Sequence, residues 1–245
     1  MHPSLPGEFY VSSAAGRTWH EKILPLRGRI CYTKRKRVVE GMGYLLIVAV
    51  GYLLGCSNMA LYLSKLKKVD PRSGGSGNLG ASNAMILMGW WAGALVGLHD
   101  IGKSVLAVFL ARWLFPNLDH ADAAAGVACV VGHVFPFYLK FKGGKGFASY
   151  VGLMFAMSWK VGLVVGAAIV LVTIITDYLV LGTFTTITVV PIWMGLARHS
   201  FILALILLVG TAVIFYKHRE NITRLRNGTE IGLRSANRGD HRVKK

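Results

Sequence analysis

The sequence predicts an all-α integral membrane protein of about seven transmembrane helices, with three polar loops on the cytoplasmic face. Composition is the first reason: 53% of the 245 residues are hydrophobic and only 16% are charged, whereas about 25% of the residues in a soluble domain are charged. Mean hydropathy is +0.49. The second reason is that the apolar residues form stretches close to the roughly 20 residues that cross a bilayer. The third is that the 28 basic residues, against 11 acidic ones, lie mainly between these stretches.

Seven apolar stretches account for the expected spans. The fourth and fifth are short, and only Lys160 separates them. Several spans contain glycine (Gly51, Gly55 and Gly152 among them), which lets helices approach closely in lipid. The expected spans are 43–63, 92–115, 123–139, 147–159, 161–176, 178–197 and 200–216.

Basic residues predict the orientation of these spans. Lysine and arginine are frequent in loops 64–91 and 140–146 and in the tail from Lys217, whereas loop 116–122 has two aspartates and no basic residue. Because cytoplasmic loops carry an excess of lysine and arginine, we expect the first three regions in the cytoplasm and the acidic loop outside.

The N-terminal arm, residues 1–41, does not fit this pattern, because it has eight basic residues and seven spans place it outside. Either the arm is cytoplasmic and one span is miscounted, or translation begins near Met42 and the arm is an upstream extension. We favour the second, since the arm has no apolar core or signal peptide. The expected domains are a basic extension over 1–41, disordered or upstream of the true start, a membrane domain over 42–233 and a basic tail over 234–245.

The first polar loop, from Asp70 to Asn83, is rich in glycine, serine and asparagine and precedes an apolar helical stretch. Such residues before a helix form nests of backbone N–H groups that bind anions. A flexible linker has a similar composition, but Arg72 and two asparagines are interleaved here. We therefore favour an anion-binding loop.

The second polar loop reads Lys-Phe-Lys-Gly-Gly-Lys-Gly and ends at Gly146. Glycine lets backbone N–H groups approach a ligand, and lysine supplies a compact positive charge. Lysines also anchor spans on the cytoplasmic side, but an anchor does not need glycines around Lys145, so we favour phosphate binding. His133, inside the preceding span, needs a partner in lipid. It is either a substrate ligand or a bridge between helices.

The third polar segment runs from Tyr216 to Glu230. In a helix, His218, Asn221 and either Arg224 or Arg226 lie near one face, which suits the binding of a polar substrate. A basic helix that lies on lipid headgroups is an equal alternative.

Other classes of protein and site are less well supported. Nucleic-acid binding is one reason for a net charge of +17, but the basic clusters interrupt membrane spans, so lipid headgroups or a phosphorylated substrate fit better. Residues 97–104 match the P-loop pattern, but that motif works between a strand and a helix, and here apolar helix continues on both sides. Asp100 and Lys103 are instead expected to form an ion pair. The spacing of the cysteines predicts no metal site, and Cys56 and Cys129 lie in apolar runs.

Together the loops resemble those of the bacterial acyl-phosphate:glycerol-3-phosphate acyltransferases, a family of integral membrane enzymes. The similarity runs from about Gly43 to Leu233. The stretches that carry it, in the family's order, are Gly75-Ser-Gly-Asn-Leu-Gly-Ala-Ser-Asn83, Asp100-Ile-Gly-Lys103, Gly132-His-Val-Phe-Pro136, Phe141-Lys-Gly-Gly-Lys-Gly146 and His218-Arg-Glu-Asn-Ile-Thr-Arg-Leu225 with Gly228-Thr-Glu230.

The resemblance implies a seven-span enzyme of the bacterial cell (inner) membrane, with its N-terminus outside and its active site facing the cytoplasm. Such enzymes transfer a fatty acyl group from acyl phosphate to the 1-hydroxyl of glycerol-3-phosphate in phospholipid biosynthesis. The products are lysophosphatidic acid and phosphate, and no cofactor is needed. The implied partners are both substrates, membrane lipids and the soluble phosphate acyltransferase that makes acyl phosphate, with no nucleic acid.

The resemblance also implies roles for single residues. The implied catalytic residues are Ser76, Lys142, Lys145 and His218. The implied substrate-binding residues are Gly77, Asn78, Gly80, Ser82, Asn83, Lys103, His133, Gly143, Gly144, Gly146, Arg219, Asn221, Arg224 and Glu230. The first and second loops would hold the acyl phosphate, and the third segment glycerol-3-phosphate. Either a phosphate oxygen of the substrate or His218 accepts the proton of the hydroxyl.

The chain departs from the family pattern in three stretches, and one of them is Cys56-Ser-Asn58 in the first span, where the family has Ser-Ile-Pro. Where the family has an arginine three residues after the asparagine of the first loop, this chain has Ile86. Before the sixth span, Asp177 and Val180 stand in place of an arginine and a serine. Ile86 and Val180 favour an alternative, a divergent relative that binds an anionic lipid precursor without catalysis or acylates another acceptor. An anion transporter is a third hypothesis, but it would need charges distributed through the spans.

Overall fold

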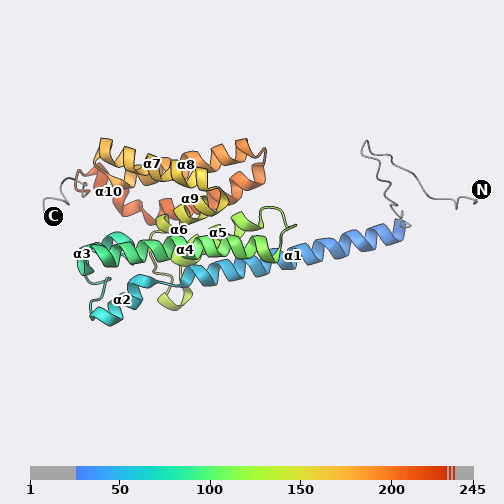
Figure 1. The fold of residues 1–245 in the computed structure, drawn as a ribbon, viewed down its shortest axis with the longest axis horizontal. Helices are drawn as coiled ribbons and strands as arrows, with labels where there is room; N and C mark the ends of the chain where they lie inside the picture. Colours follow the sequence, from blue (N-terminus) through green and yellow to red (C-terminus); the bar gives the residue numbers. More distant parts are fainter. Residues whose placement is uncertain (1–25, 231, 233, 235–245) are drawn as a thin grey trace, which may run out of the picture. The chain divides into compact units, whose positions relative to one another are not determined.

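The computed structural model describes residues 26–230, 232 and 234, and all of its regular elements in these ranges are helices (Figure 1). The helices are α1 (Leu26–Cys56), α2 (Met59–Lys67), α3 (Ala81–Met88), α4 (Trp90–Leu114), α5 (Ala121–Val134), the 3-10 helix η1 (Phe137–Leu139), α6 (Phe147–Met157), α7 (Trp159–Thr176), α8 (Leu179–Ala197), α9 (Phe201–Lys217) and α10 (Arg219–Arg226).

The chain divides into two compact units, residues 1–43 and residues 44–245. In the first unit, residues 26–41 belong to α1, whereas a disordered arm or an upstream extension was expected there. Residues 1–25 and most of the tail over 234–245 lie outside the described residues. The second unit contains the rest of α1, from Tyr44, and all the other described helices.

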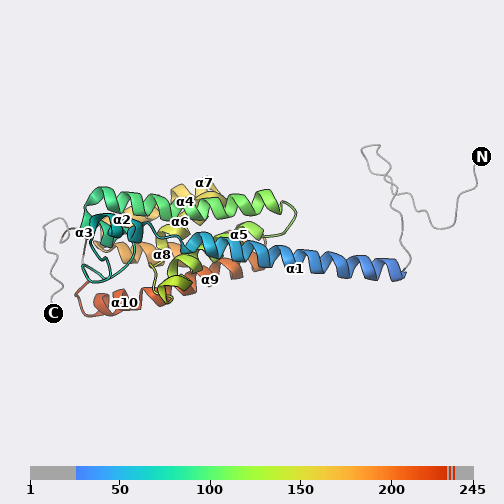
Figure 2. The same ribbon diagram turned by 90° about the horizontal axis from the view of Figure 1, so that it is seen from below.

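The all-helical membrane fold is confirmed, but the count of seven spans stays a prediction. Five described segments are long and apolar enough to cross a membrane, or six if α9 and α10, which meet at a bend of 55°, form one span (Figure 2). The remaining expected span, α6, has only 11 residues. Large apolar side chains such as Leu196 and Phe201 are 71% and 76% exposed, as expected of a surface that faces lipid.

Local sequence explains where the helices break. Asn58 caps α2, because its side chain accepts a hydrogen bond from the Leu61 N–H at 3.1 Å. Gly89 separates α3 from α4 with φ +93°, a conformation that glycine adopts without strain. Pro136 follows α5 and begins the turn that leads into the second polar loop. These breaks leave polar segments at the ends of apolar helices.

The helices of the second unit pack around α4, α6 and α8. Helix α4 packs against α3, α5 and α6, and helix α8 packs against α7 and α9 (Figures 1 and 2). The largest buried cluster includes Tyr150, Leu153, Ile187 and Leu207. The P-loop-like residues 97–104 lie inside α4, which confirms that they form continuous helix.

The expected close approach at glycines is confirmed. A Cβ on Gly51 or Gly55 would lie 2.4 or 2.1 Å from a carbonyl oxygen of α5, and one on Gly152 would lie 2.3 Å from the carbonyl oxygen of Ile101 in α4. Any larger residue at these positions would force the helices apart. The short distances fix α5 and α6 against their neighbours, and these two helices support the polar loop between them.

Candidate active site

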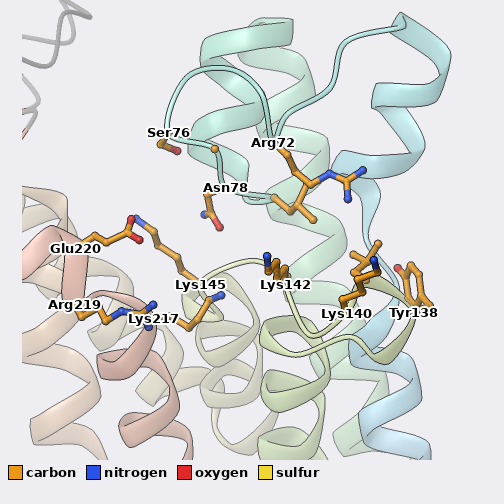
Figure 3. A pocket seen from close by; sticks show the side chains of 14 residues that line it. Arg72, Ser76, Asn78, Tyr138, Lys140, Lys142, Lys145, Lys217, Arg219 and Glu220 are labelled. Carbon is orange, nitrogen blue, oxygen red and sulfur yellow. The ribbon is translucent and has the colours of Figure 1, made fainter.

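Three polar segments meet at one cavity of about 690 Å³ (Figure 3). They are the serine loop (residues 70–80), the turn after α5 with the lysine loop (residues 140–146), and the junction of α9 with α10. The lining residues are Arg72, Ser76, Gly77, Asn78, Leu79, Tyr138, Leu139, Lys140, Lys142, Gly143, Lys145, Lys217, Arg219 and Glu220. The three polar segments singled out in the sequence thus form one site.

The charge of the cavity is strongly positive. Six of its lining side chains are lysine or arginine, and only Glu220 is acidic. Burial lowers the pKa of Lys145, and the nearby Arg224 lowers it further. The pKa of Lys217 is lowered in the same way by burial and by Arg219. Because a bound anion would relieve this crowding of positive charge, the cavity suits phosphate groups.

The serine loop is held in shape by Asn83, whose side chain is buried at the start of α3. Its amide donates to the Pro71 carbonyl at 2.6 Å, and its Oδ1 accepts the Ser76 N–H at 2.7 Å. Gly75 has φ +58°, and a Cβ there would lie 2.2 Å from the same Oδ1. Asn83 therefore positions Ser76 and Asn78 at the cavity, and it does not line the cavity itself.

The glycines of the lysine loop have a role within the fold that was not expected. The N–H of Gly143 donates to the Val134 carbonyl at 3.0 Å, and that of Gly144 to the His133 carbonyl at 3.1 Å. Both N–H groups thus have acceptors within the fold, and the expectation that they bind phosphate stays a prediction. A Cβ on Gly144 would lie 2.0 Å from His133 Nε2, and one on Gly143 would lie 2.1 Å from the His133 carbonyl oxygen. Both glycines are needed because the loop packs directly on the end of α5.

Lys145 belongs to a hydrogen-bonded chain of side chains. Its Nζ donates to Asn221 Oδ1 at 2.6 Å, and Asn221 Nδ2 donates to Glu230 Oε1 at 2.6 Å. The other oxygen of Glu230 pairs with Arg224 Nε at 2.7 Å. Asn221 and Arg224 thus share a face of α10, as predicted, and this face directs Lys145 towards the cavity (Figure 3).

His218 lies between α9 and α10 and is buried. Its Nδ1 is 2.9 Å from the carbonyl of Ile214, and its ring meets Phe184 edge-on at 5.7 Å between centroids. Burial lowers its pKa to about 4, with a contribution from Lys145, although the hydrogen bond to Ile214 opposes the shift. The imidazole is therefore neutral at pH 7. Because a carbonyl only accepts, Nδ1 carries the proton and Nε2 has a free lone pair.

Behind the lysine loop lies a buried cluster of Asp100, Lys103 and His133. The expected ion pair between Asp100 and Lys103 is confirmed, with Nζ 2.8 Å from Oδ1. Lys103 Nζ also lies 2.8 Å from His133 Nδ1 and donates to the Ser57 carbonyl at 2.9 Å. Neither Lys103 nor His133 lines the cavity. Of the two interpretations of His133, the contacts favour the bridge between helices.

The structure therefore sorts the expected site residues into two sets. Those that line the cavity are Ser76, Gly77, Asn78, Lys142, Gly143, Lys145 and Arg219. Those that do not are Gly80, Ser82, Asn83, Lys103, His133, Gly144, Gly146, His218, Asn221, Arg224 and Glu230. Several members of the second set support the first through the contacts above.

Seven lining residues were not among the expected site residues: Arg72, Leu79, Tyr138, Leu139, Lys140, Lys217 and Glu220. Lys140, Lys217 and Glu220 had a sequence signal, because they lie within the predicted polar segments, whereas Tyr138 and Leu139 lie in the turn before the lysine loop. The Nε of Arg72, which the sequence left unassigned, lies 3.3 Å from Asp70 Oδ1.

The three residues Ile86, Asp177 and Val180, where the chain departs from the family pattern, do not line the cavity. Ile86 Cγ2 would be 3.6 Å from a Cβ on Gly75, so this side chain lies beside the serine loop, and it is 43% exposed. Asp177 follows α7, and its Oδ1 accepts the backbone N–H of Arg234 at 2.8 Å. Val180 is buried in α8.

Comparison with known proteins gives one consistent result. The model of the glycerol-3-phosphate acyltransferase family matches residues 45–228. The chain is 38% identical to the glycerol-3-phosphate acyltransferase of Coxiella burnetii (strain RSA 493 / Nine Mile phase I) over 191 residues, which cover 77% of this chain and 97% of the relative. It is 37% identical to the enzyme of that name from Thermoanaerobacter pseudethanolicus over 190 residues, which cover 77% and 95%.

Two solved structures are also similar to this chain. One is the glycerol 3-phosphate form of PlsY (YgiH), an integral membrane glycerol 3-phosphate acyltransferase, with a TM-score of 0.74 and 32% identity over 79% of this chain and 97% of that one. The other is its lysophosphatidic acid form, with a TM-score of 0.71 and 33% identity over 77% and 94%.

Proposed function

Because the chain belongs to the glycerol-3-phosphate acyltransferase family, it is a membrane acyltransferase that acts on glycerol-3-phosphate, and we propose that its acyl donor is acyl phosphate, bound in the cationic cavity. The hydroxyl oxygen at the 1-position attacks the carbonyl carbon of the donor. The bond from that carbon to the phosphate oxygen breaks, and lysophosphatidic acid and inorganic phosphate are formed.

The excess of basic side chains in the cavity is the observation that carries this proposal. Both substrates are phosphates, and their negative charges repel one another when they are brought together. Six basic side chains against one carboxylate supply the attraction that offsets this repulsion. Acyl phosphate is already activated, so the site has only to align two anions and stabilise the developing charge.

The positions of the side chains suggest the division of labour. Lys142 and Lys145 stand where they would contact the donor phosphate and the carbonyl oxygen, whose charge grows as the hydroxyl attacks. Ser76 and Asn78, held by the serine loop, face them across the cavity (Figure 3). No covalent intermediate on the protein is required, since the donor carries its own leaving group.

The proton of the attacking hydroxyl has two possible acceptors. His218 is neutral at pH 7 and has a lone pair on Nε2, which fits a general base. However, His218 does not line the cavity. A phosphate oxygen of the donor is the other acceptor, and we favour it because the departing phosphate takes up the proton without any movement of the protein.

We also propose that the cavity faces the cytoplasm of a bacterial cell and that the membrane is the inner membrane. The three lysine- and arginine-rich segments all line one cavity, and such segments face the cytoplasm. A Lys140→Cys variant tests the orientation with a maleimide that cannot cross membranes. It should be labelled more strongly than the parent chain in inside-out vesicles and not in spheroplasts, and the reverse result would overturn the proposal.

The reaction is tested with the purified full-length chain in lipid nanodiscs, supplied with palmitoyl phosphate and glycerol-3-phosphate. Phosphate and lysophosphatidic acid should appear in equal amounts, and palmitoyl-CoA should not replace the donor. Acylation with the CoA ester alone would refute the proposed donor. Binding of glycerol-3-phosphate without any product from either donor would instead support the non-catalytic alternative.

A further inference from the structure

We propose that the buried cluster of Asp100, Lys103 and His133 is a positioning device that sets the place of the lysine loop in the cavity, through direct packing of the His133 ring against Gly144. This inference rests on the proposed function, because the loop that is positioned carries Lys142 and Lys145. The three residues of the cluster would be positioning residues and not substrate ligands.

The contacts of Lys103 are the first step. Lys103 Nζ donates to the Ser57 carbonyl at 2.9 Å and lies 2.8 Å from both Asp100 Oδ1 and His133 Nδ1. His133 Nδ1 is also 3.2 Å from Asp100 Oδ1. The neighbours of Lys103 Nζ in these contacts all belong to the fold. Lys103 is only 6% exposed, and burying a charged side chain within a membrane helix costs free energy. Its contacts with the fold offset this cost.

The second step is what these contacts hold together. Ser57 follows the last residue of α1, where carbonyl groups have no partner within the helix. Asp100 lies on α4, and His133 lies in the last turn of α5. Lys103 therefore joins α1, α4 and α5 at the level where α5 ends and the chain turns towards the lysine loop.

The third step is the contact between His133 and the loop. The N–H groups of Gly143 and Gly144 donate to carbonyls of Val134 and His133. A Cβ on Gly144 would lie only 2.0 Å from His133 Nε2. The loop backbone therefore rests on the edge of the imidazole, whose opposite edge is held at Nδ1 by Lys103. Any shift of the ring moves the segment between Lys142 and Lys145.

This arrangement gives a second explanation for glycine at position 144. In the usual explanation, glycine lets a phosphate approach the backbone, and a methyl group would then obstruct the ligand whatever lies behind the loop. In the proposed one, the methyl group obstructs His133. The two explanations differ in one respect: only in the second does trimming the histidine ring make room for alanine.

The experiment is a double-mutant cycle of Gly144→Ala and His133→Asn. Asparagine keeps a polar atom near the position of Nδ1, so that Lys103 retains a partner, and it removes the far edge of the ring. Gly144 does not have positive φ, so alanine there is not strained by the backbone. Gly102→Ala is the matched control, because a Cβ on Gly102 has nothing within 4 Å.

In the wild-type background, Gly144→Ala should lower kcat/KM for palmitoyl phosphate by about 100-fold, the scale of a misplacement of about 1 Å. Most of this loss should lie in KM, because the lysines that bind phosphate are displaced. In the His133→Asn background, the same substitution should cost less than about threefold. Gly102→Ala should have no effect in either background.

Equal losses in both backgrounds would overturn the inference, because the methyl group would then obstruct the ligand and not the ring. Failure of the double variant to fold, where His133→Asn folds, would also overturn it. Binding of glycerol-3-phosphate, measured by calorimetry on the same variants, separates the inference from the proposed donor. If the wild-type chain does not use palmitoyl phosphate, the proposal that acyl phosphate is the donor is refuted. The coupling between Gly144→Ala and His133→Asn is then still measured from the affinity for glycerol-3-phosphate.

Discussion

The second unit, residues 44–245, holds two groups of lysines that differ in the number of polar partners around the ammonium group. Lys103, in the buried cluster, has three polar groups of the fold within 2.9 Å of its Nζ, and one of them is the Asp100 carboxylate. In the cavity, Lys145 has one acceptor, and Lys140 and Lys142 have no hydrogen-bond or ion-pair partner among the described residues. A matched charge holds the fold together, whereas an unmatched one is available to a ligand.

This difference teaches that the number of partners, and not burial alone, separates a structural lysine from a functional one. Lys103 and Lys145 each lie in a stretch that resembles the same family, and both were expected to bind substrate. Their contacts differ: Lys103 is held by groups of the fold, whereas Lys145 lines the cavity. Substitutions in the buried cluster should therefore change stability first, and substitutions in the cavity should change turnover first.

Lys103→Met is expected to have the largest effect on stability. It removes a charge and leaves Asp100 buried without its cation, and breaking a buried pair in this way costs about 3–5 kcal/mol. The thermal unfolding midpoint in detergent measures the loss. Adding Asp100→Asn should recover part of it, because the unpaired charge is then also removed. Lys160→Met, an exposed lysine at the start of α7, is the matched control, and an equal loss there would contradict the comparison.

Lys145→Ala should show the opposite pattern. Loss of a group that stabilises developing charge lowers kcat by about 10²–10³-fold, while the midpoint should change little, because Asn221 keeps its hydrogen bond to Glu230. Phosphate release from palmitoyl phosphate measures the rate, with Lys160→Ala as control. A variant with full turnover and a lowered midpoint would place Lys145 with the structural lysines.

Ile86→Arg adds a charge to the side of the cavity where the family has an arginine. Ile86 is 43% exposed beside the serine loop, so the larger side chain has room. A guanidinium that reaches a phosphate supplies a bidentate contact, and we expect a gain of about tenfold in kcat/KM, which corresponds to about 1.4 kcal/mol. Ile86→Gln, of similar polarity without charge, is the control. A gain that is equal in both variants would mean that charge is not the missing feature.

Much of the fold was predictable because a bilayer allows few structures. The lengths of the apolar stretches predicted most of the helices. The glycines within them indicated the close packing of α1 on α5 and of α4 on α6. The break of α1 at Ser57 was missed, since apolar residues continue on both sides and only the cap at Asn58 signals it. The helix over residues 26–41 was also not expected, because a basic segment has no apolar period.

The site was predictable as a set of loops but not as a set of contacts. Lys142, Lys145 and Ser76 were expected at the cavity and line it. The roles of Gly144 and Asn83 were not predictable, because the hydrogen bonds that hold the loops come from residues whose partners lie in other elements. The periodicity of the sequence predicts on which face of a helix a residue lies. It does not predict whether that face contacts a ligand or another loop.

His218 gives the smallest expected effect, and it concerns pH. Burial holds its pKa at about 4 in the folded protein, whereas an unfolded chain has about 6.5. Between these values the unfolded state binds more protons, so stability should be lost as the pH falls from about 6.5 to 4 and should be unaffected by this group above 6.5. Unfolding midpoints across that range measure the effect. His218→Gln, which keeps a donor towards Ile214, should flatten the slope, and an unchanged slope would show that His218 is not the neutral, buried group that its role as the alternative proton acceptor requires.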